Sequence, residues 1–196
     1  GELHKLWQAG PPSSYHMEYG FSCMGYEIAG GIGLKMAQPT REVVVMVGDG
    51  SYLMMNSELA TSVMLGVKLI VVLLDNRGFG CINRLQHASG GERFNNLFDY
   101  NTVQEVSPDI DFAAHGKSLG ALSEKVSSLA DLERALKKAR SNTRTTFIVI
   151  DTDPMKSTDA GGHWWDVAIP EVSSRSPVRA ARKNYDKAKA KQRIGN

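Results

Sequence analysis

Two short polar segments, each directly after an apolar run, carry the residues best suited to chemistry. The first is Gly48-Asp49-Gly50-Ser51 and the second is Asp75-Asn76-Arg77-Gly78-Phe79. If the two apolar runs are neighbouring parallel strands, the segments meet beyond the carboxyl ends of the strands, where ligands of open sheets bind. Asp49 offers a carboxylate, Asn76 an amide oxygen and Gly78 a backbone carbonyl, and Mg²⁺ prefers such hard oxygen ligands. The sequence therefore predicts a magnesium site formed by Asp49, Asn76 and Gly78.

A dinucleotide-binding loop is the alternative interpretation of the first segment. Its two glycines are spaced as in G-x-G-x-x-G, and Asp75 ends the next apolar run, where a ribose-binding acid would lie. However, Leu53 occupies the place of the third glycine, and the Asp49 carboxylate would repel a pyrophosphate. A divalent cation removes that repulsion, and the backbone N–H groups of Gly50 and Ser51 can then hold the phosphate oxygens.

The two segments together resemble the thiamin-diphosphate motif, which consists of Gly-Asp-Gly, a spacer and a paired Asn at a strand end. Asp49 and Asn76 are 27 positions apart, a spacing similar to that of the motif, although Asp75 stands where the first Asn is usual. The resemblance implies an α/β fold with three αβα layers around a mostly parallel, doubly wound sheet. It also implies thiamin diphosphate and Mg²⁺ as cofactors. The residues that it places at the cofactor are Gly48, Asp49, Gly50, Ser51, Asn76, Gly78 and Phe79.

A Gly-containing segment upstream, from Glu18 to Gly25, is similar to the loop that ends in Met-Gly in acetolactate-synthase-like enzymes. By that likeness, the Met24 side chain props the thiazolium ring against the aminopyrimidine ring in a bent cofactor. The Ser22 carbonyl and the Met24 N–H would bond the edge of the aminopyrimidine. The alternative for Met24 is core packing, which is the commoner role of a methionine.

Further sequence segments are similar to segments of the ring-opening hydrolases of this superfamily that act in myo-inositol breakdown. These segments are Tyr15–Gly20, Cys23–Glu27, Gly162–Val167 and Pro170–Ser173. The likeness implies cleavage of a C–C bond in a small polyol-derived cyclic dione, with water releasing the acyl group as an acid. Two alternatives stay open: carboligation of 2-oxo acids, as in acetolactate synthase or glyoxylate carboligase, and a non-catalytic diphosphate-binding module.

Histidines and cysteines add further candidates. His16 precedes the Met24 loop and is the candidate catalytic residue for proton transfer or substrate contact, with a structural hydrogen bond as the alternative. His163 is a second candidate. Cys81 has no evident base nearby in sequence, which favours packing over nucleophilic chemistry. Cys81 and Ile82 stand where decarboxylases of the superfamily carry a Glu, which weighs against simple decarboxylation of 2-oxo acids.

Strands and helices must position these residues. In the sequence, apolar β-branched runs alternate with helical patterns, which is typical of a parallel sheet. Runs that are apolar throughout predict strands buried on both faces. Glycines at 30, 31 and 33 are expected to let a helix pack closely on the sheet. We expect strands at 43–47, 69–74 and 147–150, and helices at 24–36, 56–64, 111–119 and 130–139.

The amino-acid composition excludes several other classes of protein. The chain has 196 residues, 42% hydrophobic and 22% charged, which excludes wholesale disorder and a coiled coil. Two distant cysteines exclude a disulfide framework and a structural zinc site, and favour the reducing cytoplasm. Apolar runs of about six residues are far shorter than the ~20 that a membrane span needs. Residues 174–196 hold eight Lys or Arg and one acid, whereas the rest of the chain is slightly acidic, unlike a nucleic-acid-binding domain.

The expected organisation is a thiamin-diphosphate- and magnesium-binding domain at 1–152, followed by a lid-like segment and a basic tail at 153–196. We expect the tail to be a solvated helix, with a polyanion-binding arm as the alternative. Trp164 and Trp165 either close over the site or anchor the tail. The resemblance implies that a Glu on a separate pyrimidine-binding domain activates the cofactor, within a homodimer or homotetramer. Because this chain has no room for that domain and Gly1 is an unusual start, we expect a fragment of a longer enzyme.

Overall fold

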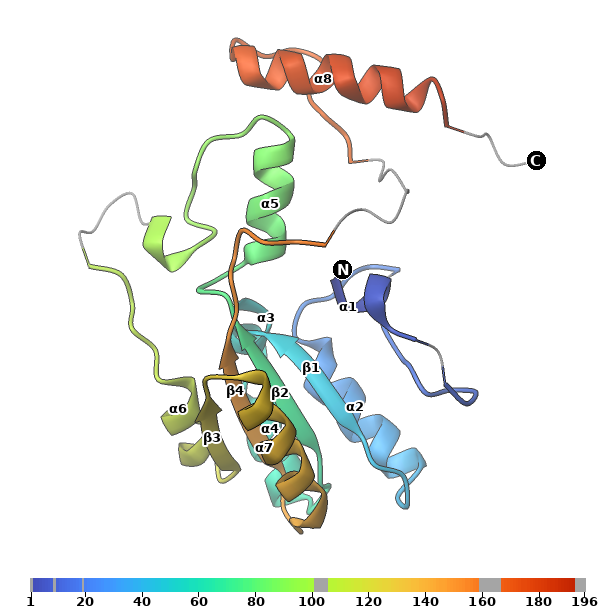
Figure 1. Ribbon diagram of the computed structural model, residues 1–196, viewed down its shortest axis with the longest axis vertical. Coiled ribbons are helices and arrows are strands. Elements are labelled where there is room, and N and C mark those ends of the chain that lie inside the picture. The colour runs from blue at the N-terminus through green and yellow to red at the C-terminus, as the bar shows by residue number, and fades with distance from the viewer. Residues whose placement is uncertain (1, 9, 19, 101–105, 159–166, 193–196) are drawn as a thin grey trace. The chain divides into compact units, whose positions relative to one another are not determined.

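The computed structural model describes residues 2–8, 10–18, 20–100, 106–158 and 167–192 and divides the chain into two compact units (Figure 1). The sheet unit comprises residues 9–79 and 107–153. The helical unit comprises residues 1–8, 80–106 and 154–196. Among the described residues, no helix combines the length and the apolar character needed to cross a membrane.

The sheet unit contains four parallel strands in the order β1-β2-β4-β3. Their bounds are β1 Val44–Gly48, β2 Ile70–Asp75, β3 Leu122–Val126 and β4 Thr146–Asp151. The two central strands, β2 and β4, are almost entirely buried because they are apolar on both faces. In the register of β1 and β2, Gly48 pairs with Leu74, so the ends of the two strands are level.

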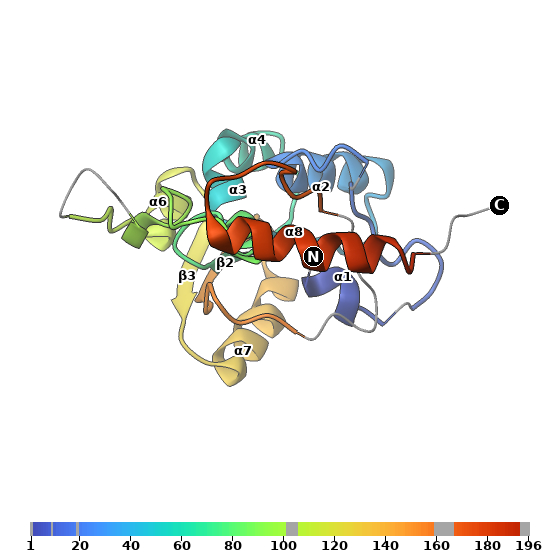
Figure 2. The ribbon, with the colours of Figure 1, turned by 90° about the horizontal axis from the view of Figure 1, so that it is seen from above.

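Helices cover both faces of this sheet, as the view from above shows (Figure 2). On one face lie α2, α3, α4 and α6, and on the other lies α7, whose Ala135 and Ala139 pack against Ile70 and Ile148. The bounds are α2 Tyr26–Ala37, α3 Asp49–Met54, α4 Ser57–Met64, α6 Phe112–Ser118 and α7 Leu129–Ser141. The expected three-layer α/β fold is confirmed.

All three expected strands and all four expected helices are present, but two elements of the sheet unit were missed. β3 has the sequence Leu-Ser-Glu-Lys-Val, whose polar centre suits an edge strand and hides it from a search for apolar runs. α3 is a short helix that begins at Asp49, directly after β1. The candidate segment 48–51 is therefore a helix entrance, and a short break at residues 55 and 56 separates it from α4.

The glycines of α2 differ in their role. A Cβ at Gly31 would lie 2.4 Å from Cγ2 of Val45, so Gly31 allows the close helix–sheet contact that the sequence predicts. A Cβ at Gly30 would meet the ring of Tyr26 within its own helix, and nothing lies within 4 Å of a Cβ at Gly33. For these two glycines, close packing against the sheet is wrong.

This difference predicts opposite effects of alanine at two positions of one helix. Gly31→Ala forces apart α2 and buried Val45, and we expect it to lower the free energy of unfolding by about 2 kcal/mol. Gly33→Ala adds a methyl group in open space and should raise that free energy by up to about 1 kcal/mol, because alanine favours the helix. Urea unfolding of both variants measures the effects, and equal shifts would contradict the close contact at Gly31.

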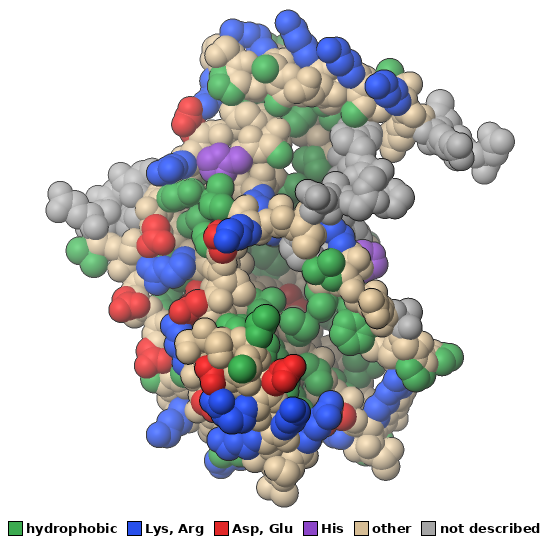
Figure 3. Space-filling model, in the orientation of Figure 1, with side chains coloured by type: hydrophobic (Ala, Val, Ile, Leu, Met, Phe, Trp, Pro, Cys, Tyr) green, Lys and Arg blue, Asp and Glu red, His purple; other side chains and the backbone are tan. Residues whose placement is uncertain are grey.

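The helical unit contains α1 Glu2–Leu6, α5 Gly80–Ala88, the short helix η1 Phe98–Tyr100 and α8 Ser176–Lys189. The basic tail forms the expected helix, and Lys and Arg side chains gather along it (Figure 3). One face of α8 is nevertheless packed, because Val178 and Tyr185 are buried with Ile169. The tail is therefore amphipathic rather than solvated on every side.

Candidate functional site: two strand ends and a glycine loop

Asp49 lies where the ends of β1 and β2 meet. It is the first residue of α3, and its side chain is fully buried. Its Oδ1 accepts a hydrogen bond from the Asn76 N–H at 3.2 Å, and its Oδ2 accepts one from the Gly78 N–H at 2.5 Å. The expectation that the two polar segments lie side by side is thus confirmed. The direct contacts run through the backbone of Asn76 and Gly78, and their role as metal ligands stays a prediction.

The surroundings of Asp49 make its negative charge costly. Burial raises the pKa of Asp49 from 3.8 to about 6, and the negative charge of Asp75 raises it as well. The N–H groups of Asn76 and Gly78 act in the opposite direction and lower this pKa. Each carboxylate oxygen has a second lone pair beyond the one used by its N–H partner. A divalent cation at these lone pairs would supply the charge that burial leaves uncompensated.

The loop after β2 owes its shape to a local side-chain contact. Asp75 Oδ1 accepts a hydrogen bond from the Arg77 N–H at 2.9 Å, and the backbone then turns through left-handed φ angles of 65° at Arg77 and 137° at Gly78. Asp and Asn both make this kind of turn. The Asp75 that departs from the usual Asn pair therefore keeps the turn that presents Asn76 and Gly78.

Gly50 allows the two loops to touch. A Cβ at this position would lie 2.8 Å from the carbonyl oxygen of Gly78 and 2.6 Å from Cδ1 of Phe79. The missing side chain thus allows the carbonyl of Gly78 to lie against the first turn of α3. A buried carboxylate, a neighbouring carbonyl and a helix entrance fit a bound Mg²⁺–diphosphate group.

The upstream segment, residues 18–25, forms a loop beside these two segments, and we call it the glycine loop. Glu18 accepts hydrogen bonds from the N–H groups of Phe21 at 2.9 Å and Cys23 at 2.8 Å, and these bonds lower the pKa of Glu18. Ser22, between those two donors, has a left-handed φ of 52°. Met24 is 44% exposed, so the structure does not support core packing for it. Within the described residues, no hydrogen bond engages the Ser22 carbonyl or the Met24 N–H, so both groups can receive a ligand.

The same loop is tied to α3 by residues that sequence reasoning did not connect. The Gly25 N–H donates to Oγ of Ser51 at 2.7 Å, and that hydroxyl donates to the Glu27 carboxylate. In the sequence, Glu27 belongs to the segment Cys23–Glu27, and no pattern there predicts a role for it. The one available signal was that Glu27 is an acid at the start of a Gly-rich helix. Its hydrogen-bond partner, Ser51, is 24 positions away in the sequence, so no local pattern connects the two. The cofactor roles of Ser22, Met24, Gly48, Gly50, Ser51 and Phe79 stay predictions.

The remaining candidates are His16, Cys81 and three residues outside the described part of the chain. His16 is exposed, and its Nε2 lies 2.7 Å from the Tyr26 hydroxyl, which is a structural hydrogen bond and leaves its catalytic role a prediction. The expected packing of Cys81 is wrong, because its side chain is exposed. His163, Trp164 and Trp165 fall outside the described residues.

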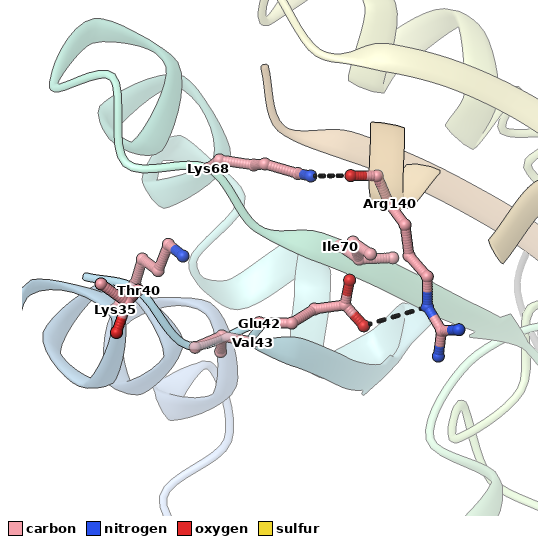
Figure 4. Close-up of a pocket in the computed structure, with 7 residues that line it drawn as sticks. All are labelled: Lys35, Thr40, Glu42, Val43, Lys68, Ile70 and Arg140. Atoms are coloured by element: carbon pink, nitrogen blue, oxygen red, sulfur yellow. Dashed lines mark hydrogen bonds and ion pairs between the residues drawn. The ribbon is translucent and has the colours of Figure 1, made fainter. Parts of the chain in front are cut away.

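A hollow of about 210 Å³ lies at the opposite end of the strands, where β1 and β2 begin (Figure 4). Its lining residues are Lys35, Thr40, Glu42, Val43, Lys68, Ile70 and Arg140. The Lys68 ammonium donates to the Arg140 carbonyl at 2.7 Å, and Nε of Arg140 lies 3.2 Å from Glu42. Because these charged groups bind one another, the hollow is a weaker candidate for a ligand site than the strand ends at Asp49.

Across the described residues, no group of three or more His, Cys, Asp or Glu side chains could hold a metal ion.

The sequences of known proteins were compared with that of this chain, and the similarities agree with a diphosphate-binding site. Residues 1–150 match the family described as thiamine pyrophosphate enzyme, C-terminal TPP binding domain. A Bacillus cereus protein named 3D-(3,5/4)-trihydroxycyclohexane-1,2-dione hydrolase 2 is 44% identical over 186 residues, covering 92% of this chain and 29% of that protein. A Bacillus anthracis hydrolase of the same name, without the number, is 45% identical over the same shares. The chain thus spans less than a third of the length of these curated relatives.

Solved structures show the same architecture. A benzoylformate decarboxylase from Polynucleobacter necessarius has a TM-score of 0.59 and 26% identity, covering 69% of this chain and 25% of that chain. A thiamine diphosphate-dependent 4-hydroxybenzoylformate decarboxylase from Rhodococcus jostii has a TM-score of 0.57 at 20% identity, over 66% of this chain and 23% of its own, and supports the fold alone. Together with the family match over residues 1–150, these findings show that the chain belongs to the thiamine pyrophosphate enzymes, as a C-terminal TPP-binding domain.

Proposed function

We propose that this chain is the diphosphate-binding part of a hydrolase that opens the ring of 3D-(3,5/4)-trihydroxycyclohexane-1,2-dione to give 5-deoxy-D-glucuronate. The observation that carries the proposal is the identity of 44–45% over 92% of the chain with relatives that bear this hydrolase name. The geometry at Asp49 supports the cofactor part of the proposal independently, because it joins the two segments that the cofactor requires.

In this proposal, Asp49, Asn76 and Gly78 hold Mg²⁺ through a carboxylate, an amide oxygen and a carbonyl. Backbone N–H groups of Gly50 and Ser51 at the start of α3 hold phosphate oxygens. The Ser22 carbonyl and Met24 N–H receive the aminopyrimidine edge, and the exposed Met24 side chain supports the bend of the cofactor. When bound, thiamin diphosphate supplies an electron sink that allows a C–C bond beside a carbonyl to break.

The proposed activity needs more than this chain. We place the activating Glu on a pyrimidine-binding domain of the same enzyme, within a homodimer or homotetramer, since the relatives are more than three times as long as the matched part. We also propose a cytoplasmic location, which suits the free, exposed Cys23 and Cys81.

The test uses the complete enzyme with Mg²⁺ and thiamin diphosphate. It is incubated separately with the cyclic dione, with pyruvate and with glyoxylate, and the products are identified by mass spectrometry. We expect ring opening of the dione to 5-deoxy-D-glucuronate and no carboligation product from the two 2-oxo acids. Formation of acetolactate or tartronate semialdehyde, with an intact dione, would replace this proposal by the carboligase.

A further inference from the structure

Glu27 lies at the junction between the glycine loop and the proposed diphosphate site. It is half-buried in the first turn of α2, and the Ser51 hydroxyl lies 2.8 Å from its Oε1 and 2.9 Å from its Oε2. Oε2 also accepts a hydrogen bond from the Gly25 N–H at 3.0 Å. The Gly25 N–H in turn points at Oγ of Ser51, 2.7 Å away. Three groups from two distant segments therefore form one closed set of hydrogen bonds.

This arrangement determines what the Ser51 side chain can still do. A hydroxyl has one hydrogen to donate, and at Ser51 that hydrogen is directed at the Glu27 carboxylate. One lone pair of the same oxygen accepts from Gly25. The side chain of Ser51 is thus committed to the glycine loop, and only its backbone N–H remains to meet a phosphate oxygen.

The backbone around Gly25 explains why the link needs an acceptor there. Gly25 has a left-handed φ of 95°, and a Cβ at that position would lie 2.9 Å from Cβ of Met55. The turn is therefore packed against the residues that follow α3. Its N–H group is turned inward and buried, where an unpaired donor is costly. Glu27 and Ser51 together satisfy it.

We propose that Glu27 is a positioning residue that sets the distance between the two halves of the cofactor site. One half is the Ser22–Met24 part of the glycine loop, which would receive the aminopyrimidine. The other half is the start of α3 with Asp49, which would receive the Mg²⁺–diphosphate group. Glu27 joins them through Ser51 and Gly25, so a ligand that spans both halves depends on it. This inference rests on the proposed binding of thiamin diphosphate.

The test compares two probes that differ in which halves they touch. Magnesium pyrophosphate contacts the diphosphate half alone, whereas magnesium thiamin diphosphate spans both. In the complete enzyme, Glu27→Gln should weaken magnesium thiamin diphosphate about tenfold, because a charged acceptor of two buried donors is lost. The affinity for magnesium pyrophosphate should stay within about twofold of the unmodified enzyme, since no group that meets the phosphates changes. Isothermal titration calorimetry measures both dissociation constants.

Two further variants sharpen the interpretation. Ser51→Ala removes the same link from the other side, so the double variant should be no weaker in binding than either single variant. Glu58→Gln is the matched control, because Glu58 also lies in the first turn of a helix of the sheet unit, and it should change neither affinity. Equal weakening of both probes by Glu27→Gln would overturn the proposal and show a general loosening of α3.

A measurement without cofactor separates this proposal from the proposed function. Hydrogen exchange of the Gly25 amide in the cofactor-free enzyme should be at least about tenfold faster in Glu27→Gln than in the unmodified enzyme. If the unmodified enzyme binds neither probe, the proposed function fails while the exchange still reports the link. Unchanged exchange at Gly25 would contradict the link itself.

Discussion

Replacing Asp49 by asparagine in the complete enzyme is expected to weaken magnesium thiamin diphosphate binding at least about a hundredfold, or ~2.7 kcal/mol. Asp49 is a fully buried carboxylate between the two strand ends, and asparagine would remove its charge and leave one oxygen to accept where two accept now. The loss should appear in both the calorimetric dissociation constant and the magnesium dependence of activity. The variant should still fold, because its buried site no longer holds a charge.

Asp75→Asn is the matched control for this experiment. Asp75 is also buried and lies at the end of β2, but its contact is with the Arg77 N–H, which an amide oxygen accepts equally well. We expect cofactor affinity within about threefold of the unmodified enzyme, a difference of under 1 kcal/mol. If Asp75→Asn were as damaging as Asp49→Asn, the negative charge of the whole loop edge, rather than the Asp49 ligand, would be what the cation requires.

The metal-free enzyme is expected to lose about 3 kcal/mol of stability through Asp49 as the pH rises from about 4 to above 6. Burial raises the pKa of Asp49 from 3.8 to about 6 in the folded state. Below pH 3.8 the carboxyl is protonated in both states and costs nothing. Between the two values, the folded state still holds a proton that the unfolded state has released, so the free energy of unfolding falls as the pH increases. Above about 6 the penalty is complete.

Urea unfolding at pH 4.5 and 7.5, in the presence of a chelator, measures most of this contribution. Other carboxyl groups titrate in the same range, and the pKa of Glu18 is lowered by its N–H donors, which gives the opposite slope. The relevant quantity is therefore the difference between the unmodified enzyme and Asp49→Asn at each pH. That difference should shift in favour of the variant at pH 7.5. A difference that is independent of pH would contradict a desolvated carboxylate at this position.

Local patterns in the sequence carry much of this architecture. Apolar runs predicted β1, β2 and β4, and their order with the intervening helices predicted a parallel sheet. Placing a polar segment after each of two such runs was sufficient to bring Asp49 and Asn76 to the same edge, because parallel strands end on one side. β3 was not predicted, because an edge strand need not be apolar. The helix α5, which begins at Gly80, is not among the predicted helices.

The sequence by itself determined which groups the two segments offer as possible ligands: one carboxylate, one amide and a turn built from glycine, at a spacing similar to that of the thiamin-diphosphate motif. Only the tertiary structure decided how these groups are connected. It showed that Met24 is exposed, that Asp49 meets the backbone of the opposite loop, and that Glu27 reaches Ser51. The physical reason is that periodicity reports which face of an element is buried. A hydrogen bond between residues 24 positions apart depends instead on how α2 packs beside β1, which the small size of Gly31 permits.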